Sequence, residues 1–143
     1  MIQLKKLFVI STVLIFGLSS CSKDDPAPVY IPAPIEGKWQ FTKEGEIIGS
    51  QEVLEDYQHT SGCTKDYTEI LAGNIIKDHY FDNPNCRETI DNGTWNRNNN
   101  SLVLSYPDQP NTVGEILELT NTTLKVKVVL PDATNIVVLT RIQ

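Results

Sequence analysis

Two histidines and their acidic neighbours are the side chains of this sequence best suited to acid–base chemistry. Asp78 directly precedes His79, and His59 lies in a stretch without a clear hydrophobic pattern. A histidine beside a carboxylate can act as a general base, and histidines also bind metals. Neighbouring residues of a strand point to opposite faces, however, so Asp78 and His79 cannot work as a pair. We therefore expect both histidines to be surface residues.

No other catalytic signature accompanies the histidines. The sequence has no nucleophile elbow, no phosphate-binding glycine loop and no closely spaced cysteine or histidine set for a metal. We predict a protein that is not an enzyme and that uses no metal and no cofactor.

Residues 1–20 are organised as an export signal. Lys5 and Lys6 precede the apolar run Leu7–Leu18, which is shorter than the ~20 residues that a membrane-spanning helix needs. The run leads into Leu18-Ser19-Ser20-Cys21, which resembles the lipobox of bacterial lipoproteins. The resemblance implies cleavage before Cys21 and acylation of that cysteine, and the acyl chains would anchor the protein to a membrane.

The residues after Cys21 suggest a location and a spacer. Ser22 does not favour retention at the inner membrane, and the run Lys23-Asp24-Asp25 resembles the surface-export signal of Bacteroidota lipoproteins. We expect a lipid anchor in the outer membrane with display at the cell surface; the periplasmic leaflet is the alternative. Residues 26–35 carry four prolines, which favour an extended tether. The predicted organisation is a signal peptide (1–20), a lipidated cysteine with a Pro-rich tether (21–35) and one small domain (36–143).

The charge balance excludes one class of partner. The chain has a formal charge of −6; cleavage removes two lysines and no acids, which leaves 10 basic and 18 acidic residues and a charge of −8. An acidic domain repels phosphate backbones, so we expect no nucleic acid partner. Nothing in the composition identifies a protein partner.

Cys63 and Cys86 remain after Cys21 is assigned to lipid. An even pair in an exported, oxidising setting predicts one disulfide, which would contribute about 3 kcal/mol in the chain-entropy model. A metal pair is the alternative, without support from close ligand spacing.

The domain reads as an all-β meander, because short alternating runs separated by turn residues dominate it. Lys125 and Lys127 alternate with apolar residues in the clearest strand, at 124–130. Three places stay open: 51–59 fits a strand or a helical turn, Glu44-Gly45 a turn or a bulge, and Asn92-Gly93 a tight turn or a bulge. The other expected strands are 38–42, 67–71, 75–81, 87–90, 94–97, 101–106, 114–120 and 135–142.

About eight strands with short connections favour an up-and-down antiparallel β-barrel, which leaves no exposed sheet edge. At this point the chain resembles a small lipocalin-like domain, of the kind frequent in Bacteroidota lipoproteins. The resemblance covers most of residues 36–143. The domain is shorter than the classical ligand carriers of this kind. The matching segments are Gly37-Lys38-Trp39, Cys63–Tyr67, Cys86, Gly93-Thr94-Trp95, Leu102–Leu104, Ile116–Leu119, Leu124–Val126 and Thr140-Arg141.

The resemblance implies a structural pair and a candidate cavity. Arg141 would pack across Trp39 at the closed end of the barrel and contribute roughly 0.5–2 kcal/mol. Inward side chains of a small barrel either fill it or line a pocket. Two functions stay open: binding of a small hydrophobic ligand in the barrel mouth, or a filled barrel with a structural or protein-interaction role. The candidates for cavity lining are Phe41, Tyr67, Tyr80, Trp95, Leu104 and Val126.

Overall fold

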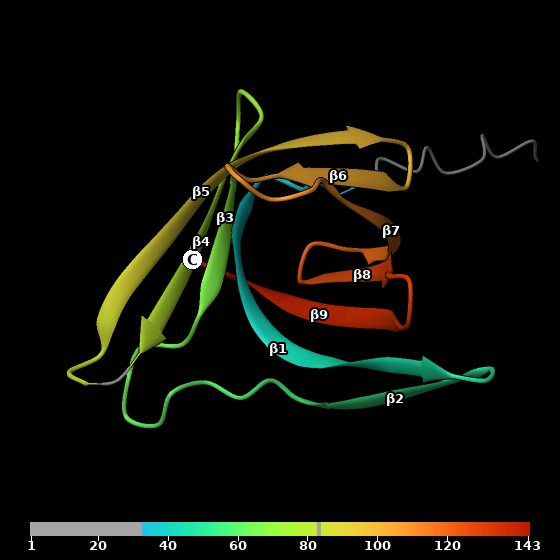
Figure 1. The fold of residues 1–143 in the computed structure, drawn as a ribbon. Coiled ribbons are helices and arrows are strands. Elements are labelled where there is room, and N and C mark those ends of the chain that lie inside the picture. Colours follow the sequence, from blue (N-terminus) through green and yellow to red (C-terminus); the bar gives the residue numbers. More distant parts are fainter. Residues whose placement is uncertain (1–32, 83) are drawn as a thin grey trace, which may run out of the picture. The chain divides into compact units, whose positions relative to one another are not determined.

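The structure, a computed structural model that describes residues 33–82 and 84–143, is a closed antiparallel β-barrel (Figure 1). The prediction of an all-β, up-and-down antiparallel barrel is therefore confirmed. The predicted signal peptide, Cys21 and most of the tether lie outside the described residues. Within those residues, no helix is long and apolar enough to cross a membrane.

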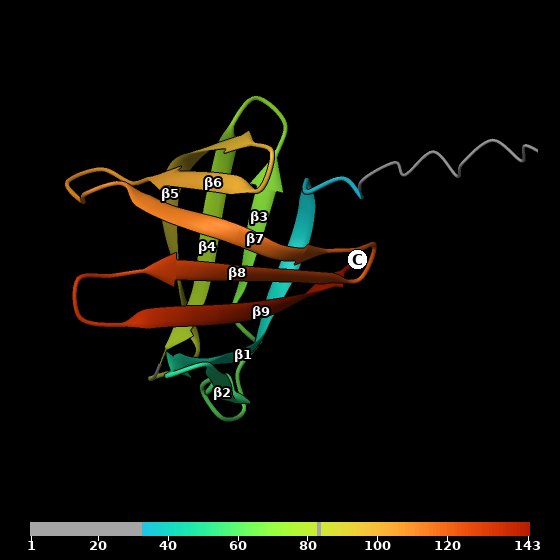
Figure 2. The same ribbon diagram turned by 90° about the vertical axis from the view of Figure 1, so that its right-hand side faces the viewer.

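Nine strands pair in one sheet in the order β2-β1-β3-β4-β5-β6-β7-β8-β9. Pairing of β1 with β9 closes the sheet, so eight strands form the barrel and β2 extends it beside β1. Strands β6 to β9 cross in front of β3 and β4 at a steep angle (Figure 2). The strands are β1 (Gly37–Ile48), β2 (Gln51–Asp56), β3 (Tyr67–Leu71), β4 (Ile75–Asp82), β5 (Arg87–Asn98), β6 (Ser101–Ser105), β7 (Thr112–Leu119), β8 (Thr123–Val129) and β9 (Thr134–Ile142).

Strand β5 runs through Asn92-Gly93 without a turn or a bulge, unlike either sequence-based expectation. Its first half pairs with β4 and its second half with β6, and Thr94 pairs with both neighbours. A Cβ on Gly93 would lie 2.6 Å from the carbonyl oxygen of Ser105 and 2.7 Å from the Tyr106 ring. Glycine is therefore needed for close approach, and it makes room for Tyr106.

Two bulges explain irregular side-chain alternation. The β1–β9 register shifts between Phe41 and Lys43, and the β7–β8 register shifts between Ile116 and Glu118. In β7 the extra residue is Leu117, which is exposed, whereas Ile116 stays buried. A bulge inserts one residue into one strand and so resets which side chains face inward.

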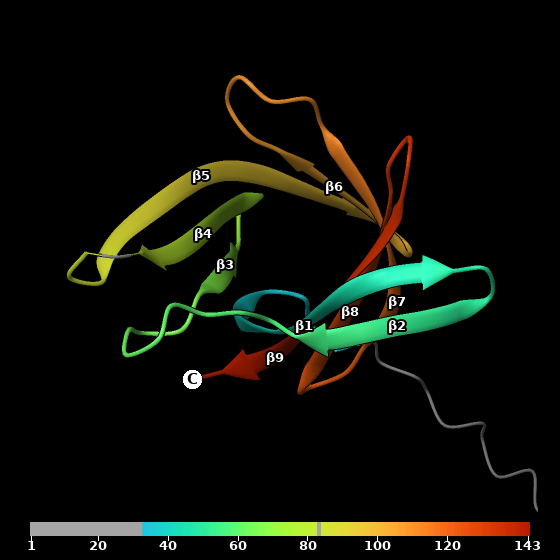
Figure 3. The same cartoon turned by 60° about the horizontal axis from the view of Figure 1, so that its bottom comes forward.

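The sequence of residues 51–59 is compatible with a strand or a helical turn, and residues 51–56 form strand β2. This strand runs beside the second half of β1 (Figure 3). Gly45 neither turns nor bulges β1; it lets β2 approach, because a Cβ there would lie 1.9 Å from the Val53 carbonyl oxygen. Ile136 pairs with Gly45 and is 0% exposed, yet it lies outside the barrel's core cluster. An ion pair joins Glu52 of β2 to Lys125 of β8. We infer that β2 covers this part of the outer surface.

The core lies inside the barrel and is closed at one end by Trp39. The Trp39 indole nitrogen donates a hydrogen bond to the Ile35 carbonyl at 2.7 Å, and the Arg141 guanidinium lies 4.0 Å from the centre of the indole ring. Ile35, assigned to the tether from the sequence, belongs to this core because its side chain is buried beneath the barrel end. The buried members of the cluster are Ile35, Trp39, Ile70, Ile76, Trp95, Leu102, Ile116, Leu124, Val126 and Leu139.

Arg141 also ties the chain entering β1 to the end of the barrel. Its guanidinium donates to the backbone carbonyls of Pro34, Glu36 and Asn121. A Cβ on Gly37 would lie 2.2 Å from the Arg141 guanidinium, and Gly37 has a φ of +146°. A glycine at this position therefore allows both the backbone conformation and the approach of Arg141.

A disulfide joins Cys63 to Cys86, with their Cα atoms 5.2 Å apart. It connects the β2–β3 loop to the β4–β5 turn, and the expected pairing is therefore present. Residues 31–143 form one compact unit that contains all nine strands and the whole core cluster. A chain that starts at Ser22 thus retains every element of the fold.

Candidate ligand cavity

A cavity of about 250 Å³ lies inside the barrel. Most of its lining is aliphatic or aromatic, and the side chains come from both crossing halves of the barrel. This size lies just below the roughly 300–1,000 Å³ of typical small-molecule sites. The lining residues are Phe41, Thr68, Ile70, Ile76, Asp78, Tyr80, Leu102, Leu104, Tyr106, Leu124, Val126, Val128, Val137 and Leu139.

Asp78 is the one acidic side chain of that lining, and it is 9% exposed. In the strand register it lies between Thr68 of β3 and Asp91 of β5. Directly opposed residues of antiparallel strands share a face, so Asp91 directs a second carboxylate to the same side of the sheet. Oδ2 of Asp78 accepts a short hydrogen bond from the Tyr106 hydroxyl.

Burial raises the pKa of the Asp78 carboxyl above its usual range, and Asp91 adds to this effect. The Thr68 and Tyr106 hydroxyls act in the opposite direction and lower the pKa of Asp78, because donors that face the carboxylate favour its charged form. Burial, followed by the Asp78 charge, raises the pKa of both the Tyr80 and Tyr106 hydroxyls. Both tyrosines are therefore neutral at physiological pH.

Thr68 brings a second polar group to the cavity wall. The residue is 5% exposed, and its hydroxyl oxygen accepts no hydrogen bond from any described residue, although the hydroxyl lies close enough to the Asp78 carboxylate to lower the pKa of that group. A buried polar group without a partner costs roughly 1–3 kcal/mol. The hydroxyl is thus available to a molecule inside the cavity.

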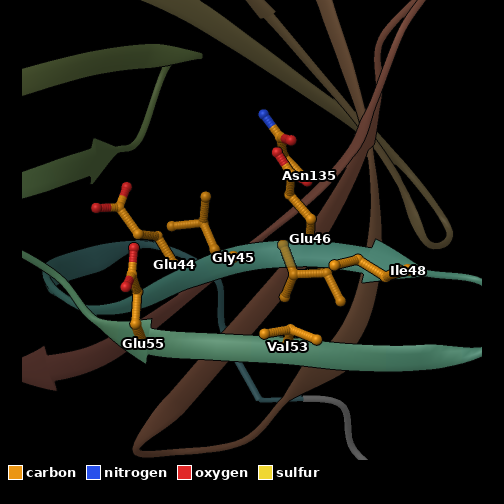
Figure 4. Close-up of a pocket in the computed structure, with 9 residues that line it drawn as sticks. Glu44, Gly45, Glu46, Ile48, Val53, Glu55 and Asn135 are labelled. Carbon is orange, nitrogen blue, oxygen red and sulfur yellow. The ribbon is translucent and has the colours of Figure 1, made fainter.

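A second hollow, of about 390 Å³, lies along the inner faces of β1, β2 and β9. We call it the vestibule; Val137 lines both it and the cavity. Glu44 and Glu46 of β1 and Glu55 of β2 rise from the same face of these strands into it (Figure 4). Neither the vestibule nor the cavity is lined by a lysine, an arginine or a histidine.

Four lysines of the described residues pair with acids on the outer surface instead. Their side chains alternate with inward-facing residues of β1 and β8, so they point away from the cavity. No ion pair among residues 33–82 and 84–143 involves a vestibule glutamate. The pairs are Lys38–Glu69, Lys43–Asp56, Lys125–Glu52 and Lys127–Glu115.

Four of the six predicted lining residues, Phe41, Tyr80, Leu104 and Val126, line the cavity. Tyr67 does not, because it alternates with Thr68 and lies on the outer face, where its ring stacks on His79 at 4.3 Å. Trp95 also does not line it: its indole nitrogen donates to the Leu71 carbonyl at 2.9 Å and its ring packs in the core.

The expectation of two surface histidines is wrong. His79 does point away from the cavity, but the Tyr67 ring covers it and Glu88 Oε1 lies 2.8 Å from its Nδ1. His59 is largely covered and joins two backbone segments.

The hydrogen bonds of His59 assign its tautomer. Its Nδ1 accepts from the Asp66 amide at 3.0 Å, so Nε2 carries the proton and donates to the Phe41 carbonyl at 2.9 Å. Both histidines thus have structural contacts. No group of three potential ligands among the described residues could hold a metal ion.

Sequence reasoning missed Asp78, Thr68 and Tyr106 as site residues. Asp78 lies between Ile76 and Tyr80 on one face of a predicted strand, and this alternation could have marked it as inward-facing. Tyr106 gave no such signal, because it lies just beyond the end of β6 and its position depends on Gly93.

Comparison with known proteins supports this fold. Residues 35–126 match the family described as the lipocalin-like domain. A crystal structure of a lipocalin-like protein from Bacteroides uniformis is similar, with a TM-score of 0.55 and 9% sequence identity, over 75% of this chain and 97% of that one. At this identity the likeness concerns the fold alone. No curated protein matches the sequence.

Proposed function

Since the chain belongs to the family of lipocalin-like domains, we propose that it is a membrane-anchored binding protein that holds a small apolar ligand inside its barrel. The observation that carries the proposal is the cavity of about 250 Å³ with its mainly aliphatic and aromatic lining. Burial of apolar ligand surface contributes roughly 25 cal/mol per Å², so such a lining favours a ligand with an apolar body.

The shape of the barrel suggests where the ligand enters. Trp39, Arg141 and Ile35 cover one end, whereas the vestibule lies along the inner faces of β1, β2 and β9. The shared Val137 makes the vestibule the natural route to the cavity. The closed end serves stability and the open end serves binding.

Native mass spectrometry of the chain that starts at Ser22, purified from its own host, tests this proposal. We expect a co-purifying small molecule, and displacement of a neutral hydrophobic fluorescent probe by the extracted compound. A protein that carries no ligand and binds no such probe would instead support a filled barrel that works through its exterior.

We also propose that Cys21 is the lipid anchor and that the domain is displayed from the outer membrane. The support is the signal-like run Leu7–Leu18, the Leu18-Ser19-Ser20-Cys21 motif and the charged residues Lys23-Asp24-Asp25. Two or more acyl chains give a stable anchor.

Changing Cys21 to Ala should release the full chain from membranes or leave it unprocessed. Membrane fractionation with an unchanged mature size would contradict the anchor. Alanines at Lys23, Asp24 and Asp25 should keep the protein in membranes but protect it from protease added to cells. Equal protease sensitivity would contradict the export signal.

A further inference from the structure

We propose that the ligand is a cation: a small molecule with an apolar body and a protonated amine, which binds Asp78 inside the barrel after passing the acidic vestibule. This inference rests on the proposed binding function and names its ligand class. It follows from the charges of the inner surface, the free hydrogen-bonding groups and the position of Asp78.

The first support is the sign of the charge along the route. Asp78 lies in the cavity, Asp91 is paired with it across β4 and β5, and three glutamates line the vestibule. No positively charged side chain lines either space. Like charges directly opposed on a sheet repel each other, although solvent weakens the effect because Asp91 is exposed. None of the lysine ion pairs among the described residues involves Asp78 or Asp91, and a bound amine would supply the missing cation.

The second support is independent of charge. The Thr68 hydroxyl is buried in the cavity wall beside Asp78, and its oxygen accepts no hydrogen bond from any described residue. Thr68 is the direct β3 neighbour of Asp78, whose Oδ2 is already bound by Tyr106. An ammonium group has three donors, which can reach the carboxylate and the threonine oxygen together.

The same lining disfavours anionic amphiphiles. A fatty carboxylate would place its charge near Asp78 or the vestibule glutamates, with no arginine or lysine in the lining to bind it. A buried charge needs a partner of opposite sign. A neutral alcohol could bind Thr68, but it would lack the charge-assisted contact with Asp78.

Isothermal titration of the chain that starts at Ser22 with octylamine, 1-octanol and octanoate tests the inference at pH 7. The three probes share one apolar body and differ in charge. We expect octylamine to bind about tenfold more tightly than octanol, and octanoate more weakly than octanol. Asp78→Asn should remove the advantage of octylamine and leave octanol binding within about twofold.

Two further variants control the experiment. Asp78→Asn keeps an oxygen for the Tyr106 hydroxyl, and its thermal melt checks the fold. Glu118→Gln removes one acid from the outer face of β7 and should change no affinity.

If neither octanol nor octylamine binds, the proposed binding function itself fails. If octanol or octanoate binds as tightly as octylamine, or Asp78→Asn leaves octylamine binding unchanged, binding stands and the cationic class is wrong.

Discussion

Tyr106 donates a hydrogen bond to Asp78 across the barrel interior, although β5 separates the strand of Asp78 from the connection that carries Tyr106. Gly93 of β5 makes this contact sterically feasible, because a Cβ at that position would lie 2.7 Å from the Tyr106 ring. The contact fixes the orientation of a carboxylate in a mainly apolar lining. A side chain held in this way at a cost in stability is typical of a binding site.

Asp78→Asn should make the domain more stable at neutral pH. The pKa of Asp78 is raised above its ordinary value of 3.8 in the folded state. At a pH between the pKa of Asp78 in the unfolded chain and its pKa in the native protein, the native protein holds a proton that the unfolded chain has lost. The contribution of Asp78 to the free energy of unfolding therefore falls as pH rises through this window. Above the folded pKa the buried charge costs stability, and the asparagine avoids this cost.

Denaturant melts of both proteins from pH 7 down to pH 3 measure this difference. We expect the variant to be more stable by about 1 kcal/mol or more at pH 7, with the gap shrinking as the pH falls toward 3.8. The groups that face Asp78 are Thr68, Tyr80, Asp91 and Tyr106, and His79 is its chain neighbour. A wild type that is more stable at pH 7 would show that the carboxylate stabilises the fold.

Trp39→Ala should cost about 3–5 kcal/mol, as for a buried large aromatic side chain. Trp39 is fully buried, donates to Ile35 and lies beneath Arg141. A small domain has roughly 5–15 kcal/mol in total, so the variant should be barely folded. At the open end, Ile48→Ser should change stability by less than about 0.5 kcal/mol, because Ile48 is 63% exposed. Equal effects in urea melts would contradict a closed and an open end.

The sequence predicts the closed end of the barrel better than its cavity. Trp39 and Arg141 fall in recognisable places of the first and last strands, and the alternation at 124–130 marks Leu124 and Val126 as inward-facing. Where both faces of a strand carry apolar or aromatic residues, as at 67–71, alternation does not say which face is inside. For this reason Tyr67, on the face opposite Thr68, could be taken for a lining residue.

Long-range contacts account for the remaining differences. The strand at 51–56 is largely exposed because it lies at the edge of the sheet beside β1, and its approach to β1 requires Gly45. His79 is buried because Tyr67 and Glu88 come to it from neighbouring strands, and His59 is partly buried because it bonds to the backbone of Phe41 and Asp66. Such contacts depend on register and bulges, which local patterns do not specify.

Removal of the disulfide, as Cys63→Ser with Cys86→Ser, should cost about 2–4 kcal/mol. The bridge closes a sequence separation of 23 residues, and it connects two loops near the Asp66 side chain, which accepts a hydrogen bond from the Phe81 amide. Guanidinium melts with and without reductant measure the loss. Thiol labelling of the denatured, unreduced protein should find neither cysteine free. Reaction of both cysteines with the label would contradict the pairing.

The vestibule glutamates should control how fast a cationic ligand associates. Glu44, Glu46 and Glu55 lie in one hollow without a lining cation, and a hollow of one charge sign raises the local concentration of the opposite ion. Replacing all three by glutamine should slow association of octylamine several-fold at low salt and leave its dissociation rate nearly unchanged. Stopped-flow displacement of a neutral fluorescent probe measures both rates.

The salt dependence separates steering from direct contact. Because the Debye length is about 10 Å at 0.1 M salt, wild-type association should slow as salt rises, whereas the triple variant should respond little. Octanol association should be equal in both proteins, since it carries no charge to steer. An unchanged association rate with a faster dissociation would mean instead that the glutamates contact the bound amine. The amine would then lie in the vestibule, and Asp78→Asn would leave octylamine binding intact.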